Sequence, residues 1–324
     1  PVLASFLSGE PPILMQALLG GDKTVKIVFS AKTYRAVHAL STEIRNVNLA
    51  IIDAYLSHPK PSLNEYMLLL NPKYKHLQSH FEHISELIAG GTLIHAGRNH
   101  LYAIEIDGIK MCIKEYRKPR FLNQFVYRFF RKSKGLRAWL HSDMLRQTGF
   151  DSPENIAYIQ SSSLWGIGIC YYICLYQEGR TLYHWGNKAL SEIHTDVTAF
   201  AQLTARLHQA GIMLCDYTPG NILQTEKGFA FVDTNRMYQG EVSIKRGLRN
   251  MAGLWLQPDV ADYLTSQYIK ARGIDCTPTH VSLMRRYRKV FWKKFARKHA
   301  ISTEKVHTDL DGNSYYFNIQ STIQ

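Results

Sequence analysis

"LCDYTPGNILQTEKGFAFVDTNR" occupies residues 214–236 and places three oxygen-bearing side chains around one predicted hairpin. Asp216 lies in a loop just after a helix predicted over 191–211. The Pro-Gly pair that follows favours a turn, which brings Asn221 back beside Asp216. "NIL" and "FAFVD" are short apolar strands joined by a tight turn at "TEKG", so Asp233 returns close to Asn221. The pattern therefore predicts one separate carboxylate and, nearby, an amide–carboxylate pair.

These three side chains match the needs of phosphoryl transfer. An Asn carbonyl and a carboxylate are hard oxygen ligands, which suit Mg²⁺. Asp216 is then free to accept or orient the proton of an acceptor hydroxyl. Kinases use a loop Asp, an Asn five residues later and a second, metal-binding Asp. The hairpin thus predicts Asp216 as the catalytic residue and Asn221 and Asp233 as the metal ligands.

A second candidate element lies upstream, where "GIKMCIKEY" (108–116) places Lys114 on an apolar strand. A lysine that faces the interior is costly unless it meets an anion, and ATP phosphates would satisfy it. Taken alone, Lys114 also fits an edge strand from which its ammonium group reaches solvent. The preceding turn has a single glycine, and its backbone N–H groups are candidates to cover the phosphates; its residues are Gly97, Arg98 and Asn99.

The predicted order of elements is strands, helix, strands, helix, hairpin and helices, which favours a small sheet-rich lobe followed by a larger helical lobe. The predicted elements are an antiparallel meander over 92–116, a helix over 121–149, two strands over 154–179, the helix over 191–211 and basic helices to about 300. We therefore expect an α+β, bilobal fold like that of protein kinases. Its predicted parts are a short α/β extension (1–65), an N-lobe (66–178) and a C-lobe (179–324).

Composition narrows the class of protein. The chain has 324 residues, 45% of them hydrophobic, which is enough for a sizeable core. Its net charge of +13 implies an anionic partner. The five cysteines lack a CxxC pair, so buried free thiols are expected rather than a zinc site. No stretch is long and apolar enough to predict a membrane span.

The resemblance to a known family extends over roughly residues 69–300. "LHQAGIMLCDYTPGNIL…FAFVDTNRM" (207–237), "AGRNHLYAIEIDGIKMCIKEYRKP" and "RRYRKVFWKKFARKH" resemble the lipopolysaccharide core kinase family (the Kdo/WaaP group) in its Bacteroides-type form. That resemblance implies ATP and Mg²⁺ as cofactors and phosphorylation of a sugar hydroxyl, on Kdo or heptose, in the lipopolysaccharide inner core. It gives Asp216, Asn221, Asp233 and Lys114 the same roles as the residue patterns do.

Two departures from the family pattern stand out. Leu214 occupies the position where kinases often have His, two residues before the catalytic Asp. Leu140 stands where relatives carry a helix Glu that pairs with the strand Lys. Asp143 lies about one turn along the same helix face and is the candidate substitute as partner of Lys114.

The positive charge does not by itself show whether the anionic partner is a lipid or a nucleic acid. "KEYRKPRFLNQFVYRFFRKSKGLR" (114–137) and "RRYRKVFWKKFARKH" (285–299) interleave basic and aromatic residues. A glycolipid in an anionic inner leaflet would attract such a surface, and so would nucleic acid. No nucleic-acid-reading motif is present, which favours lipid and a cytoplasmic, peripheral position at the inner membrane. The alternatives are a protein or small-molecule kinase of the same fold and a catalytically weak, pseudokinase-like lipid-binding module.

Overall fold

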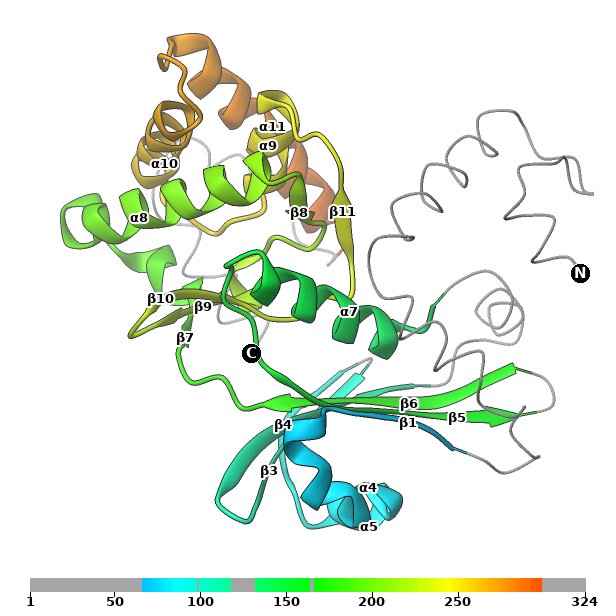
Figure 1. Cartoon of the computed structure of the whole chain (residues 1–324). Helices are drawn as coiled ribbons and strands as arrows, with labels where there is room; N and C mark the ends of the chain where they lie inside the picture. The colour runs from blue at the N-terminus through cyan, green and yellow to red at the C-terminus, as the bar shows by residue number, and fades with distance from the viewer. Residues whose placement is uncertain (1–65, 98, 118–131, 164–165, 299–324) are drawn as a thin grey trace, which may run out of the picture. The chain divides into compact units, whose positions relative to one another are not determined.

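The computed structural model describes residues 66–97, 99–117, 132–163 and 166–298 (Figure 1). These residues belong to the second of two compact units of the chain, Leu63–Gln324, while the first unit is Pro1–Ser62. The α/β extension predicted over residues 1–65 lies outside the described residues.

The first lobe is built on a six-stranded sheet in which every neighbouring pair is antiparallel, with strand order β1-β5-β6-β4-β3-β2. Its strands are β1 (Tyr66–Leu70), β2 (Thr92–Ala96), β3 (Asn99–Ile106), β4 (Ile109–Tyr116), β5 (Asn155–Ser163) and β6 (Gly166–Leu175). The predicted meander and the predicted strand pair are confirmed. Because β4 lies between β3 and β6, Lys114 is on an inner strand and not on an edge.

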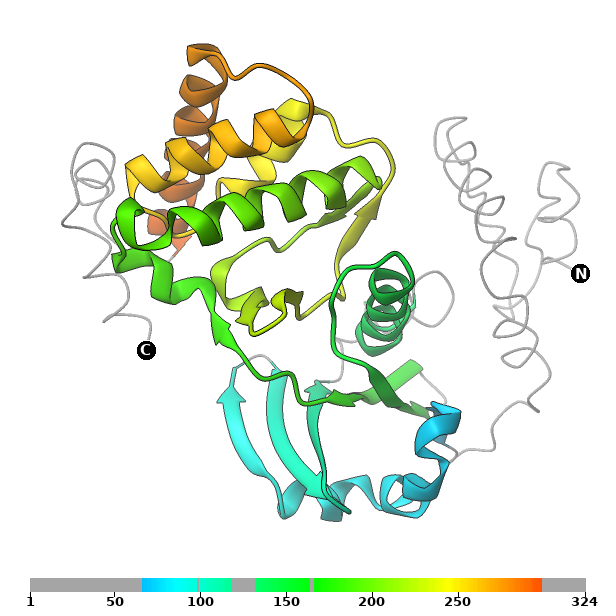
Figure 2. The same cartoon turned by 60° about the vertical axis from the view of Figure 1, so that its left-hand side comes forward.

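The two faces of this sheet are covered by different helices, since side chains alternate along each strand. Met111 and Ile113 of β4 are fully buried on one face, against the 3₁₀ helix η1 (Pro72–Leu77) and the short helices α4 (Gln78–Glu82) and α5 (Ile84–Ala89) (Figure 2). Tyr116 belongs to the opposite face, which packs against helix α7. Lys114 shares the α7 face.

Helix α7 (Lys134–Gln147) begins later than the sequence predicted. Residues 132 and 133 are not helical, and residues 121–131 of the predicted helix lie outside the described residues. The Ser133 side chain accepts a hydrogen bond from the Leu136 amide at 3.1 Å, so it caps the first turn. Serine is a favoured N-cap because its oxygen satisfies an otherwise unpaired helix amide, and this explains the correction.

The second lobe is mainly helical. Its helices are η2 (Leu182–Asn187), α8 (Leu190–Gln209), α9 (Ile244–Met251), α10 (Pro258–Ala271) and α11 (Pro278–Lys298). Helix α8 confirms the predicted helix, and Gly211 just beyond its end has φ +73°, the left-handed conformation that commonly terminates helices. Helices α8 and α10 run side by side (Figures 1 and 2) and share an apolar core with the hairpin strands.

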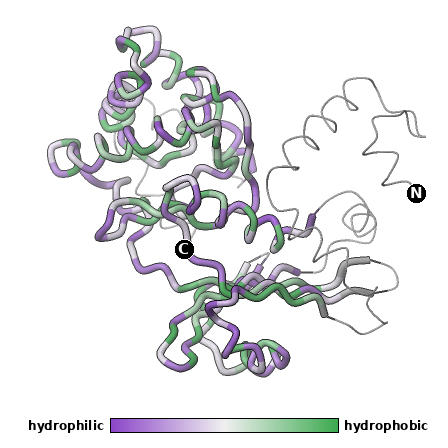
Figure 3. The backbone as a smooth tube through the Cα atoms, in the orientation of Figure 1, coloured by the Kyte–Doolittle hydropathy of each residue, from purple (hydrophilic) through white to green (hydrophobic). Residues whose placement is uncertain are grey.

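The bilobal, protein-kinase-like fold class predicted from the sequence is confirmed by this arrangement of an antiparallel sheet followed by a helical lobe. Hydrophobic residues are frequent along the sheet strands (Figure 3), and buried hydrophobic residues of the helices form the core of the second lobe. The predicted lobe boundary at 178–179 falls in the segment that joins β6 to the short strand β7 (Arg180–Thr181). Among the described residues, no helix combines the length and apolar character that a membrane span requires.

A buried polar network joins the helices to the loop of Asp216. His208, near the end of α8, is 1% exposed, and its ring nitrogens lie 3.0 Å from the Tyr268 hydroxyl and 3.3 Å from the Asn250 side-chain oxygen. Asn250 in turn donates to the Leu214 carbonyl at 2.8 Å, two residues before Asp216. Burial lowers the pKa of His208 to about 4.

This burial predicts a pH dependence of stability. The unfolded imidazole takes up a proton near pH 6.5, whereas the folded one stays neutral until about pH 4. Between these values the unfolded state binds more protons, so the free energy of unfolding falls as the pH falls, by about 2 kcal/mol from pH 6.5 to about pH 5. Urea unfolding across this range should show the fall.

His208→Gln should remove this part of the pH dependence. His194→Gln is the matched control, because His194 is exposed on the same helix. An unchanged pH slope in His208→Gln would contradict the prediction.

Candidate active site

The predicted hairpin is present and is held by an additional pair of strands. Its elements are β8 (Ile212–Leu214), the turn η3 (Pro219–Asn221), β9 (Ile222–Thr225), β10 (Gly228–Phe231) and β11 (Met237–Gln239). Strands β9 and β10 confirm the predicted pair, and β7 extends them to a three-stranded sheet. Strand β8 was not predicted, and it separates α8 from the loop of Asp216. It pairs with β11, so the two ends of the candidate site are fixed to each other.

The turn brings Asn221 against the loop of Asp216, as predicted. The Asn221 amide donates to the Thr218 carbonyl at 3.0 Å, which closes the turn. The Asn221 side-chain nitrogen donates to the main-chain oxygen of Asp216 at 2.9 Å. The Val232 amide donates to the Asn221 carbonyl at 2.9 Å, one residue before Asp233. Backbone and side-chain bonds therefore place Asn221 between the other two candidate residues.

Lys114 and Asp233 form an ion pair. The Lys114 Nζ lies 2.6 Å from Asp233 Oδ1, and the side chains are only 17% and 28% exposed, respectively. The pair joins the inner strand of the sheet to the end of the hairpin. It also explains how an inward-facing lysine is tolerated on β4, because its charge is compensated.

Asp233 adopts an unusual backbone conformation, with φ +54°. Left-handed φ values are uncommon for residues other than glycine and concentrate at functional sites, where the surrounding structure enforces them. Here Asn235 donates a side-chain hydrogen bond to the same Oδ1 atom that Lys114 contacts. The carboxylate is thus held by two donors at a strained turn.

Helix α7 is hydrogen-bonded to the residue that follows Asp233. The His141 ring nitrogen Nδ1 lies 2.6 Å from the Thr234 carbonyl oxygen, and the Thr234 hydroxyl donates to the Ala138 carbonyl at 3.1 Å. Asp143, the candidate partner of Lys114, instead accepts a hydrogen bond from Gln147 at 2.9 Å, and burial raises the pKa of its carboxyl group. The acidic partner that Leu140 cannot supply is therefore Asp233, which corrects the expectation for Asp143.

Asp216 is paired with a residue that sequence reasoning did not assign. The Arg236 guanidinium donates to Asp216 Oδ2 at 2.6 Å, and both side chains are about half exposed. The β8–β11 ladder continues between them, since the Cys215 amide donates to the Arg236 carbonyl at 3.0 Å. The only sequence signal was the position of Arg236, three residues after Asp233. A molecule that binds the Asp216 carboxylate must share it with this guanidinium or displace it.

The candidate phosphate-covering turn lies between β2 and β3. The Gly97 amide donates to the Asn99 carbonyl at 3.2 Å, so this N–H group is engaged in the hairpin. Asn99 begins β3 and pairs with Tyr116 of β4, while Arg98 lies outside the described residues. The role of Gly97, Arg98 and Asn99 toward phosphates stays a prediction.

Tyr116 is a further residue of the site that the sequence did not indicate. Its side chain is 2% exposed, and among the described residues its hydroxyl group has no hydrogen-bond partner. Lys114 Nζ lies 5.5 Å from the ring centre, and burial together with the Asp233 charge raises the pKa of Tyr116. A buried hydroxyl without a partner is costly, so a polar atom of a bound molecule or a water would be stabilised here.

Asn221 and Asp233 offer the oxygen donor atoms that a magnesium ion would use. No group of three or more His, Cys, Asp or Glu side chains that could hold a metal occurs in the described part of the chain. Asn221 and Asp233 provide two oxygen donors, and the Asn221 side-chain nitrogen is already bonded to Asp216, which leaves the side-chain oxygen as the ligand atom. Mg²⁺ is commonly held by one or two carboxylates together with waters and substrate phosphates, so this small set suits it.

Of the known proteins compared with this chain, only solved structures match it. No family model matches the chain, and no curated protein matches it. Among solved structures 1119 chains match. One of them, described as "WaaP in complex with acyl carrier protein", is similar with a TM-score of 0.48 and 16% sequence identity, over 69% of this chain and 99% of that chain.

Proposed function

We propose that this chain is an ATP- and Mg²⁺-dependent phosphotransferase with a hydroxyl group as acceptor. The observation that carries the proposal is the 2.6 Å pair of Lys114 and Asp233, formed beside Asn221 and the loop of Asp216. Lys114 and the three hairpin residues were predicted from two separate stretches of sequence, with phosphate, metal and proton roles, and they belong to one connected set of contacts.

Each side chain has a definite task in this proposal. Lys114 binds nucleotide phosphate oxygens, which replaces part of its contact with Asp233. Asp233 and Asn221 hold the metal, which when bound supplies charge neutralisation of the phosphates. Asp216 orients the acceptor hydroxyl and accepts its proton as the bond to phosphorus forms. The hydrogen bond from Asn221 to the Asp216 main chain fixes the distance between the metal-binding and proton-accepting residues.

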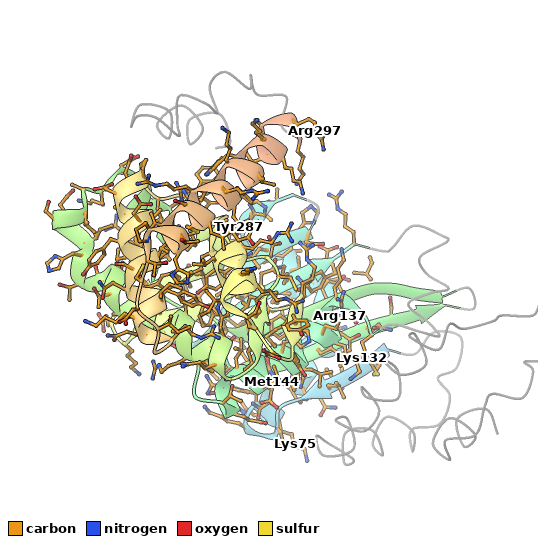
Figure 4. The ribbon with its side chains drawn as sticks, turned by 90° about the horizontal axis from the view of Figure 1, so that it is seen from above. Lys75, Lys132, Arg137, Met144, Tyr287 and Arg297 are labelled. Carbon is orange, nitrogen blue, oxygen red and sulfur yellow. The ribbon has the colours of Figure 1, made fainter. Side chains whose placement is uncertain are left out.

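We further assign the acceptor to the lipopolysaccharide inner core, as a sugar hydroxyl of Kdo or heptose. The sequence resemblance to the Kdo/WaaP group supports this choice, and so does the positive charge of α11. Arg288 of this helix is buried and donates to the Leu254 and Leu256 carbonyls, at 3.1 and 2.6 Å, so it serves the fold. Other basic side chains of α11 are exposed, with Arg297 near its end (Figure 4); these are Arg286, Lys289, Lys293, Lys294, Arg297 and Lys298.

Such a surface supports a peripheral position on the anionic cytoplasmic face of the inner membrane. Each exposed basic residue near an anionic surface contributes about 1 kcal/mol of attraction. The glycolipid acceptor carries phosphates and carboxylates of its own, so the same charges would also favour substrate capture.

The decisive experiment is phosphate transfer by the purified full chain. With labelled ATP, Mg²⁺ and lipid A–Kdo acceptor, we expect label in the glycolipid, and mass spectrometry of the core oligosaccharide should locate the added phosphate. Labelling of the chain's own Ser, Thr or Tyr residues without any transfer to glycolipid would favour a protein kinase instead. Absence of both Mg-ATP binding and turnover would leave the pseudokinase-like lipid-binding module.

A further inference from the structure

Two cysteines lie opposite each other on the sheet face that carries Lys114. Cys112 of β4 is in register with Cys174 of β6, and the Cys174 thiol donates to the Cys112 main-chain carbonyl at 3.9 Å. Both are free thiols. Cys174 is 6% exposed and Cys112 is partly exposed, so Cys112 is the accessible member of the pair.

The backbone geometry permits a bond between them. The Tyr176 amide donates to the directly opposite Lys110 carbonyl at 2.9 Å. Directly opposed residues alternate between hydrogen-bonded and non-bonded pairs, so Cys112 and Cys174, two positions further along the ladder, form a hydrogen-bonded pair with Cα atoms about 5.5 Å apart. Disulfides span roughly 4.4–6.8 Å between Cα atoms, so the separation of these two Cα atoms lies within the range that a disulfide bridges.

The electrostatic surroundings favour reaction at Cys112. The hydrogen bond with Cys174 and the charge of the nearby Lys114 lower the pKa of the Cys112 thiol, against the opposing effect of burial. The same hydrogen bond and burial raise the pKa of Cys174. A thiol with a lowered pKa and partial exposure, next to a second thiol that can resolve it, is the arrangement found in redox-sensitive cysteine pairs.

We propose that Cys112 and Cys174 form an oxidisable dithiol, a modification site for peroxides on the wall of the candidate nucleotide site. The Cys112 thiol gives up its proton, the thiolate attacks a peroxide oxygen, and the O–O bond breaks, so that a sulfenic acid forms and the released hydroxide takes up that proton as water. The Cys174 sulfur then attacks the sulfenic sulfur, the S–O bond breaks, and a second water leaves with the remaining proton. Two thiols and one hydrogen peroxide thus give one disulfide and two waters, and an added dithiol reverses the change.

Oxidation should reach the nucleotide site through β4. Opposed Cβ atoms in a ladder are about 4.5–5.5 Å apart, whereas a disulfide brings them to about 3.8 Å. The disulfide therefore draws β4 toward β6 at a position two residues from Lys114. The contact of Lys114 with Asp233 is short, and both side chains are mostly buried. We expect weaker nucleotide binding in the oxidised chain. This consequence rests on the proposed function, but the disulfide itself does not.

The test treats the purified full chain with hydrogen peroxide and follows it by mass spectrometry. The expected product has lost the mass of two hydrogen atoms and yields one linked peptide that joins Cys112 to Cys174. Cys112→Ser and Cys174→Ser should each prevent it, whereas Cys170→Ser should not, because Cys170 lies opposite Tyr116 on the same face. Oxidation that occurs first at the exposed Cys215 or Cys276, or no intramolecular link, would overturn the proposal.

A second readout tests the consequence separately. A fluorescent ATP analogue with Mg²⁺ should bind the oxidised chain at least about fivefold more weakly, the lower end of typical coupling between two sites. Dithiothreitol should restore binding, and saturating Mg-ATP should slow formation of the disulfide. If the disulfide forms but nucleotide affinity does not change, the placement beside the nucleotide is wrong. If neither state binds nucleotide, it is the proposed function that fails, while the linked peptide still decides the dithiol.

Discussion

Asp216→Asn is expected to lower kcat for phosphate transfer by a factor of about 10²–10⁴, the usual contribution of a general base. Asparagine keeps the size and the hydrogen-bonding capacity toward Arg236 but cannot accept the acceptor proton. Nucleotide binding should change little, because the Asn221 bond is made to the main chain of Asp216 and survives the substitution. Steady-state kinetics together with nucleotide titration would separate the two effects.

Glu226→Gln provides the matched control for Asp216→Asn. Glu226 is an exposed carboxylate in the turn of the same hairpin, so its loss removes the same charge without touching the candidate site. Its kcat should stay near that of the natural chain. Full activity in Asp216→Asn would remove Asp216 from the reaction and with it the proposed mechanism.

Asp233→Asn is expected to have the second large effect, a fall in kcat/KM of about 10²–10³ with a higher Mg²⁺ requirement. Removing a carboxylate that binds the metal directly lowers the affinity for Mg²⁺, and Lys114 loses the negative charge that compensates its own. Asparagine is the informative substitution because, like aspartate, it tolerates the left-handed conformation observed at φ +54°. Alanine at this position would add backbone strain, so the effect of losing the carboxylate could not be separated from the effect of the strain.

The control for Asp233→Asn is Asp143→Asn. The sequence predicted Asp143 as the partner of Lys114, whereas the structure pairs Lys114 with Asp233. Measuring kcat/KM against Mg²⁺ concentration for both variants decides between them. Equal losses in the two variants, or the larger loss in Asp143→Asn, would contradict the assignment.

Several strands could be predicted from the sequence because the residue patterns that indicate them lie within the strands and their turns. Alternating apolar residues predicted β2, β3 and β4, and turn residues with short apolar runs predicted β9 and β10. Strands β8 and β11 are three residues each, too short for a periodic pattern, so their pairing was not predictable. The late start of α7 depends on a single capping hydroxyl, from Ser133.

The partners of the candidate residues were less predictable. Lys114 and Asp233 are far apart in sequence, and no spacing rule connects them. The sequence offered Asp143 because helix periodicity places it near Leu140, but periodicity carries no information on the left-handed turn that aims Asp233 at the sheet. The Arg236–Asp216 pair depends on the unpredicted β8–β11 ladder in the same way.

The two hydrogen bonds between α7 and Thr234 have a thermodynamic consequence. Ala138 and His141 of the helix are hydrogen-bonded to Thr234, which directly follows Asp233, so a displacement of α7 strains the backbone at Asp233. Thermodynamic linkage makes such coupling reciprocal. If a ligand on Asp233 strengthened the binding of a partner to α7 by some factor, the partner would strengthen the binding of that ligand by the same factor. A molecule that bound the face of α7 turned away from Thr234 would therefore change ligand affinity at Asp233 without entering the candidate site.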